Sequence, residues 1–110
     1  MKELPARTRQ HALMDVLFHA LRVTDESLNK NAALVLSQLG GDPVSRLILE
    51  AARRKNRVPH RLRVLAVIER IGQLSSADDW LLLSTLAADP NEQIRVAAGR
   101  CLATCPISDA

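Results

Sequence analysis

The chain has 110 residues, of which 47% are hydrophobic and 25% are charged, and its formal net charge is +3. A chain of this length buries roughly two-thirds of its unfolded surface, which supports a single domain over residues 1–110 without a metal or a disulfide. No apolar stretch is long enough to cross a membrane, and the N-terminus lacks a basic segment followed by an apolar run, so we expect a cytoplasmic protein with no membrane partner.

The first predicted hairpin covers about residues 5–40. Apolar residues at steps of three and four predict an amphipathic helix over about residues 5–23. Thr24 or Asp25 is placed to cap a second helix. We expect Gly40-Gly41 to end that helix, because glycine adopts a positive φ at no steric cost.

The second predicted hairpin covers about residues 42–72. Asp42-Pro43 combines an N-cap side chain with a proline whose missing N–H is harmless in the first turn of a helix. The third helix then ends in a basic run over residues 53–57. Pro59 is expected to open the fourth helix and Gly72 to end it.

The third predicted hairpin covers about residues 75–105. Ser76, with Asp79 three residues later, resembles a capping box and predicts the start of the fifth helix. Asp89-Pro90 predicts the start of the sixth, with Asp89 as the N-cap. No segment alternates as a strand does, and the connections are short. The six helices should therefore pack as antiparallel neighbours.

The even-numbered predicted helices end at a regular interval. Their ends fall at Leu39-Gly40, Ile71-Gly72 and Leu102-Ala103, so the spacings are 32 and 31 residues. Stacked helix pairs produce a fixed period in this range, because one hairpin cannot bury its apolar face alone. The sequence predicts an all-α fold of three stacked antiparallel hairpins.

The final segment carries a more specific pattern. Residues 89–102 open on Asp-Pro, place an Ile-Arg pair shortly afterwards, and continue with small alanines and a leucine. This segment resembles the second helix of a HEAT repeat, in the armadillo-like superfamily. The resemblance implies a right-handed α-α superhelix in which Asp89 and Arg95 take part in a ladder between neighbouring repeats. The simpler interpretation is that Asp89 caps a helix and Arg95 is a solvated cation.

Positive charge is concentrated on the middle hairpin. Between Arg46 and Arg70 the chain has eight basic residues and two acidic ones. The turn between the third and fourth helices should gather a basic cluster at one end of that hairpin, made of Arg53, Arg54, Lys55, Arg57, Arg61 and Arg63. Three interpretations stay open: solvated cations that complement a helix dipole, a site for an acidic protein, or a site for nucleic acid phosphates.

The apolar run from Trp80 to Leu83 is too wide for one helical stripe. Either the fifth helix is enclosed in the stack, or part of it, including Trp80, forms an interface. The sixth helix raises a related question, because its stripe of Ala97, Ala98, Cys101 and Leu102 could be left uncovered. Such an uncapped end would favour self-association.

We find no residue set that predicts catalysis, a cofactor or a metal. No base stands beside a nucleophile and no phosphate-binding glycine loop is present. Cys101 and Cys105 share one helical face and are expected to be buried and reduced. The sequence therefore predicts a protein-interaction module and not an enzyme, with a shallow groove lined by the even-numbered helices. Nucleic-acid binding through the basic cluster is the alternative.

Overall fold

The computed structural model describes residues 6–39, 44–74 and 76–106. These residues form six α-helices and no strand, which confirms the predicted all-α class. In chain order the helices are α1 (Ala6–Arg22), α2 (Glu26–Gln38), α3 (Val44–Ala52), α4 (Val58–Ile71), α5 (Ala77–Leu86) and α6 (Glu92–Thr104). None of the helices in these ranges is both long and apolar enough to span a bilayer.

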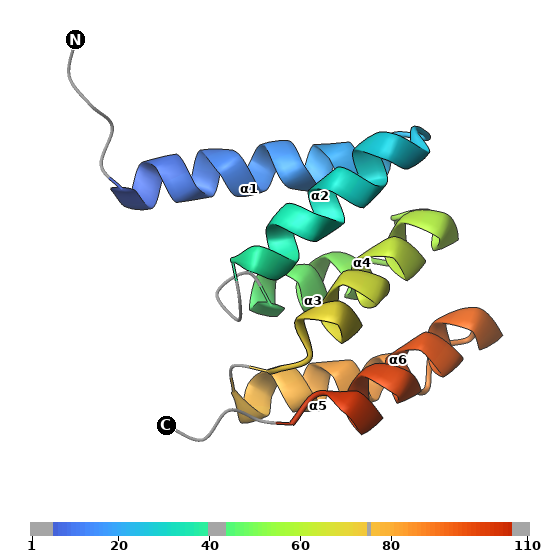
Figure 1. Ribbon diagram of the computed structural model, residues 1–110. Helices are drawn as coiled ribbons and strands as arrows, with labels where there is room; N and C mark the ends of the chain where they lie inside the picture. Colours follow the sequence, from blue (N-terminus) through green and yellow to red (C-terminus); the bar gives the residue numbers. More distant parts are fainter. Residues whose placement is uncertain (1–5, 40–43, 75, 107–110) are drawn as a thin grey trace, which may run out of the picture.

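The helices pack in consecutive pairs, α1 with α2, α3 with α4, and α5 with α6. The two members of each pair run in opposite directions, and the pairs follow one another from the top to the bottom of Figure 1. α4 packs between α2 and α6, so that the even-numbered helices form one row. α3 and α5 pack on each other in a second layer beside this row. α4 also contacts α1, which places it at the centre of the molecule.

The core is made almost entirely of aliphatic side chains. Its largest fully buried members come from every described pair of helices, and they include Leu36 of α2, Ile48 of α3, Leu65 of α4, Leu83 of α5 and Ile94 of α6. These side chains form one core cluster because the stacked pairs bury their apolar faces against one another. Short aliphatic chains allow this close approach of one helix to the next.

Several predicted helix ends are confirmed. Asp25 caps α2, with Oδ1 accepting a hydrogen bond from the Leu28 backbone N–H at 3.1 Å. Ser76 caps α5, and its hydroxyl accepts from the Asp79 N–H at 3.2 Å. Gly72 ends α4 at a φ of 73°, a left-handed conformation that other residues rarely adopt. Gly40-Gly41 and Asp42-Pro43 lie outside the described residues.

Of the two described helix starts marked by a proline, one is confirmed and one is shifted along the chain. α4 begins at Val58 with Pro59 in its first turn, as predicted. α6 begins at Glu92, and its N-cap is Asn91, whose Oδ1 accepts from the Ile94 N–H at 3.1 Å. The prediction that Asp89 caps this helix is wrong, because one oxygen of the Asp89 carboxylate accepts from the Asn91 N–H and the other binds an arginine. The Asp-Pro pair forms the turn before the helix.

Both cysteines are buried and reduced, as the sequence predicts. The Cys101 Sγ donates to the Leu65 carbonyl at 3.2 Å, and the Cys105 Sγ donates to the Ile68 carbonyl at 3.6 Å. Burial raises the pKa of Cys101 to about 12, so this thiol stays protonated and unreactive at neutral pH. The two side chains fasten α6 to α4 in the core.

Candidate binding surfaces

The turn between α3 and α4 and the start of α4 bring together only part of the predicted basic cluster. Lys55, Arg57 and Arg63 line a cleft of about 350 Å³ together with Arg22 from the end of α1. Its other lining residues are polar or small: Thr24, Asn56, Pro59 and His60. We call this the basic cleft. Arg53 and Arg54 are exposed on the same turn but do not line it.

Arg61, predicted to belong to the exposed basic cluster, points into the protein instead. It is only 4% exposed. Its Nε donates to the Ala51 carbonyl at 2.7 Å, and its Nη2 donates to the Asp89 carboxylate at 2.7 Å. Arg61 lies at helical spacing from the buried Val64 and Leu65, which is the sequence signal that its basic neighbours obscured.

Asp89 links the second and third helix pairs, but through Arg61 and not through Arg95. The Arg95 guanidinium donates to the backbone carbonyls of Asp89 and Pro90, at 2.9 and 3.0 Å. Burial alone would raise the pKa of Asp89, but the hydrogen bonds from Arg61 and the Asn91 N–H outweigh burial and hold that pKa below its ordinary value. Asp89 is therefore charged in the folded protein at neutral pH.

A second buried carboxylate, that of Glu50 on α3, was not singled out from the sequence. Arg22 Nη2 lies 2.9 Å from both of its oxygens, and His60 Nε2 lies 3.1 Å from Oε2. Asn56 Nδ2 donates to the Glu50 backbone carbonyl at 2.9 Å. Burial raises the pKa of Glu50, yet the hydrogen bonds from His60 and Arg22 outweigh burial and leave that pKa lowered. The spacing of Glu50 from the buried Leu47 is the only sequence signal for its position.

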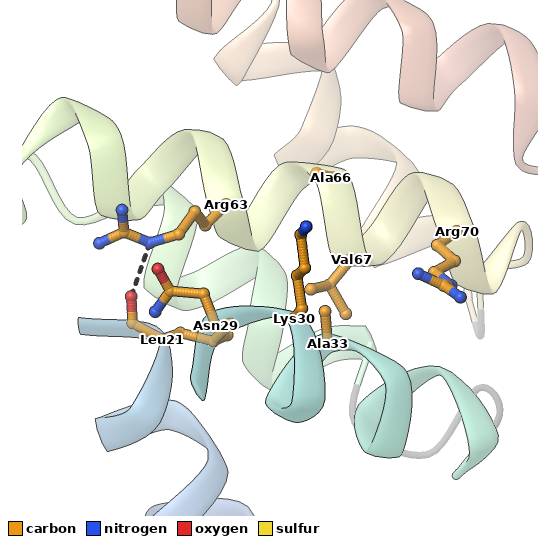
Figure 2. Close-up of a pocket in the computed structure, with 8 residues that line it drawn as sticks. All are labelled: Leu21, Asn29, Lys30, Ala33, Arg63, Ala66, Val67 and Arg70. Atoms are coloured by element: carbon orange, nitrogen blue, oxygen red, sulfur yellow. Dashed lines mark hydrogen bonds between the residues drawn. The ribbon is translucent and has the colours of Figure 1, made fainter. Parts of the chain in front are cut away.

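The row of even-numbered helices carries a groove between α2 and α4, with a volume of about 200 Å³ (Figure 2). Its floor is apolar and includes Ala33, Ala66 and Val67. Figure 2 shows Lys30 extending from α2 toward α4, with Arg63 and Arg70 at the two ends of the groove. Leu21 and Asn29 complete the lining, and no acidic residue belongs to it. We call this the α2/α4 groove.

A second depression lies between α4 and α6. It is lined by Leu62, Glu92, Gln93, Val96 and Arg100 and has a volume of about 340 Å³. Its charges are mixed in sign, unlike those of the α2/α4 groove. Both depressions lie between neighbouring even-numbered helices, and the prediction that these helices line one shallow binding groove stays a prediction.

Trp80 is on the surface. It is 41% exposed and its neighbour Leu81 is 57% exposed, whereas Leu83 is buried. The interpretation that the fifth helix is enclosed on all sides is therefore wrong, and the interface interpretation of Trp80 stays a prediction. The apolar stripe of α6, which from its sequence could have been left uncovered, is covered by the rest of the protein. Its residues Ala97 and Ala98 are buried.

No family model, curated protein or solved structure matches this chain. In the part of the chain that the structure describes, no group of three or more histidine, cysteine or acidic side chains could hold a metal ion. The candidate sites are thus the two depressions of the even-numbered row and the basic cleft beside it.

Proposed function

We propose that this protein is a HEAT-like helical-repeat module, wound as a right-handed superhelix, that binds another protein along the row of α2, α4 and α6. The 32- and 31-residue spacing of the helix ends and the consecutive packing of the pairs support the repeat architecture. Modules of this kind offer an extended binding surface on the concave side of the stack. We place the principal contact in the α2/α4 groove.

The chemistry of the groove carries this proposal. Three cations, Lys30, Arg63 and Arg70, surround a floor of small apolar side chains. Lys30 has only an exposed ion pair with Glu26, at 3.5 Å, and exposed pairs of this kind contribute little. The groove therefore fits a partner segment that carries small apolar side chains on one side and carboxylates at its edges.

Nucleic acid is less well matched to these surfaces. Arg61 is buried in an ion pair, and Arg53 and Arg54 stand apart from the basic cleft, so the predicted cluster is not one continuous stripe of free cations. Trp80, the exposed aromatic residue, is on α5, which does not pack on α2 or α4. A base stacked on Trp80 would lie away from the cations that should hold its phosphate.

The test is a selection of binders from a library of short random peptides displayed at a surface. We expect enriched peptides to combine acidic residues with small apolar ones, because both features of the groove select for them. The double variant Lys30→Glu and Arg70→Glu should lower the affinity for these peptides by about tenfold or more, which corresponds to about 1.4 kcal/mol. Isothermal titration calorimetry measures this change.

The matched control is Arg54→Glu, which reverses an exposed cation that lines neither the groove nor the cleft. Its affinity for the selected peptides should stay within about threefold of the unmodified protein at physiological salt. Enrichment of basic or purely apolar peptides would contradict the proposal. An equal loss of affinity in both variants would do the same.

A further inference from the structure

The basic cleft is a distinct feature that the proposed partner site does not use in full. Its cations come from separate segments: Arg22 ends α1, Lys55 and Arg57 lie on the turn before α4, and Arg63 is one turn into α4. The stacking of the first two helix pairs brings them together. Thr24 adds a hydroxyl and Asn56 an amide to the same wall.

The positive charge of the cleft is not balanced by acids at its surface. No acidic side chain lines it. Glu50, the carboxylate that binds two of the lining residues, Arg22 and His60, is itself buried. Within those ranges neither Lys55 nor Arg57 forms an ion pair, and Arg63 only donates its Nε to the Leu21 carbonyl at 2.7 Å. Their remaining donors are available to an anion.

His60 also lines the cleft, although its side chain is nearly enclosed, at 4% exposed. Because a carboxylate accepts hydrogen bonds, the contact with Glu50 assigns the proton to Nε2. The other ring nitrogen, Nδ1, is buried and has no hydrogen-bond partner in the structure. With the proton on Nε2, Nδ1 is an acceptor and cannot donate to an anion, so the cations of the cleft alone provide its complementarity to a negative charge.

We propose that the basic cleft is a binding site for a phosphate monoester. Such a group carries nearly two negative charges at neutral pH and three acceptor oxygens, which match two or more guanidinium groups and an ammonium. The cleft, at about 350 Å³, is at the small end of ligand pockets and suits one compact dianion better than an extended strand. The monoester can belong to a small phosphorylated molecule or to a phosphorylated side chain.

The second source connects the cleft to the proposed partner site. Arg63 lines both the basic cleft and the α2/α4 groove. A partner segment in the groove can therefore place a phosphorylated residue in the cleft without leaving the surface. The phosphate site itself does not depend on that partner, since Lys55 and Arg57 line only the cleft, whereas Lys30 and Arg70 line only the groove.

The experiment titrates the full chain with phenyl phosphate and follows its backbone amide resonances by NMR at constant ionic strength. We expect saturable shifts confined to residues 22–24 and 55–63. The double variant Lys55→Glu and Arg57→Glu should weaken binding by about tenfold or more, whereas Arg54→Glu on the same turn should change it by less than about threefold. Circular dichroism shows whether each variant is folded, and these side chains are exposed, so folding should be retained.

Further ligands show whether the phosphate is free or belongs to a partner side chain, and whether nucleic acid binds the cleft instead. If inorganic phosphate and phenyl phosphate bind equally well, the site takes the free group, and tighter binding of a phosphoserine version of a selected acidic peptide assigns it to a partner side chain. A single-stranded oligonucleotide without terminal phosphates that binds the cleft more tightly than phenyl phosphate would overturn the monoester in favour of nucleic acid. Shifts that do not saturate, or that chloride reproduces, would also overturn it.

Variants in the α2/α4 groove test the phosphate site in the basic cleft separately from the proposed peptide site in the groove. Lys30→Glu with Arg70→Glu should weaken peptide binding by about tenfold or more and leave the affinity for phenyl phosphate unchanged within about threefold. If peptides fail to bind while phenyl phosphate binds at the cleft, only the partner site is wrong. If phenyl phosphate fails while acidic peptides bind in the groove, only the phosphate site is wrong.

Discussion

The middle helix pair makes two very different junctions with its neighbours. Toward α5 and α6, the ion pair of Arg61 and Asp89 is enclosed, with each side chain about 5% exposed. Toward α1 and α2, the carboxylate of Glu50 is enclosed but its partner Arg22 is 46% exposed and faces the basic cleft. Arg46 of α3 also reaches across to α1, where it binds Asp15 and stacks over the Phe18 ring.

The difference shows how the same kind of contact can serve structure or binding. A pair without access to water cannot exchange partners, and removing one member leaves a buried charge. A cation at the edge of a cleft keeps hydrogen-bond donors for a ligand while it holds a buried acid. We therefore assign the junction of Arg61 with Asp89 to stability, and the junction of Arg22 with Glu50 to stability together with recognition.

The largest expected effect comes from Arg61→Leu. This change leaves the Asp89 carboxylate buried without its main partner, and such losses cost about 3–5 kcal/mol. Urea denaturation measures the free energy of unfolding. Adding Asp89→Leu should restore much of the loss, because the unpaired charge is then gone. A cost below about 1 kcal/mol for the single variant would show that water reaches this junction.

The corresponding change at the junction of Arg22 with Glu50 is Glu50→Gln, and its cost should be smaller. Arg22 can be hydrated when the negative charge is removed, so we expect a loss of about 1–3 kcal/mol in the free energy of unfolding. Glu26→Gln, in an exposed pair with Lys30, is the matched control and should stay within about 0.5 kcal/mol. A cost for Glu50→Gln equal to that of Arg61→Leu would remove the distinction between the junctions.

Acid should weaken both junctions gradually. The folded pKa values of Glu50 and Asp89 lie below their ordinary values of 4.5 and 3.8, so both carboxylates stabilise the fold above those values. The unfolded chain binds more protons in acid, and stability is therefore lost as the pH falls below about 4.5. Urea denaturation at a series of pH values measures the slope. The double variant Arg61→Leu and Asp89→Leu lacks the Asp89 carboxylate, so its stability should fall less steeply with pH. An unchanged slope would contradict the lowered pKa of Asp89.

The smallest effect is expected outside both junctions, on the exposed side of α5. Leu81→Ala removes a side chain that is 57% exposed, and we expect a change within about 0.5 kcal/mol by urea denaturation. Leu83→Ala on the same helix removes a fully buried side chain and should cost about 2–5 kcal/mol. Similar costs at the two positions would mean that another surface covers α5.

The helices and most of their caps could be predicted because their signals are local. The apolar stripes and the cap at Asp25 need only neighbouring residues, whereas the placements of Arg61 and Glu50 depend on helix stacking. Arg61 was grouped with adjacent cations although its spacing from Val64 matches the core face. The ion pair of Asp89 with Arg61 joins residues far apart in the sequence, and so does the cleft that Arg22 lines. Neither could be predicted without the fold.

The central claim is that partners bind on the row of even-numbered helices. The most direct measurement is an NMR titration of the full chain with the acidic peptide that the selection enriches most. We predict that the largest amide shifts fall on residues 29–33 of α2 and 63–70 of α4, around the α2/α4 groove. Largest shifts around Trp80 and Leu81 on α5 would contradict the claim and would assign binding to the opposite layer of helices.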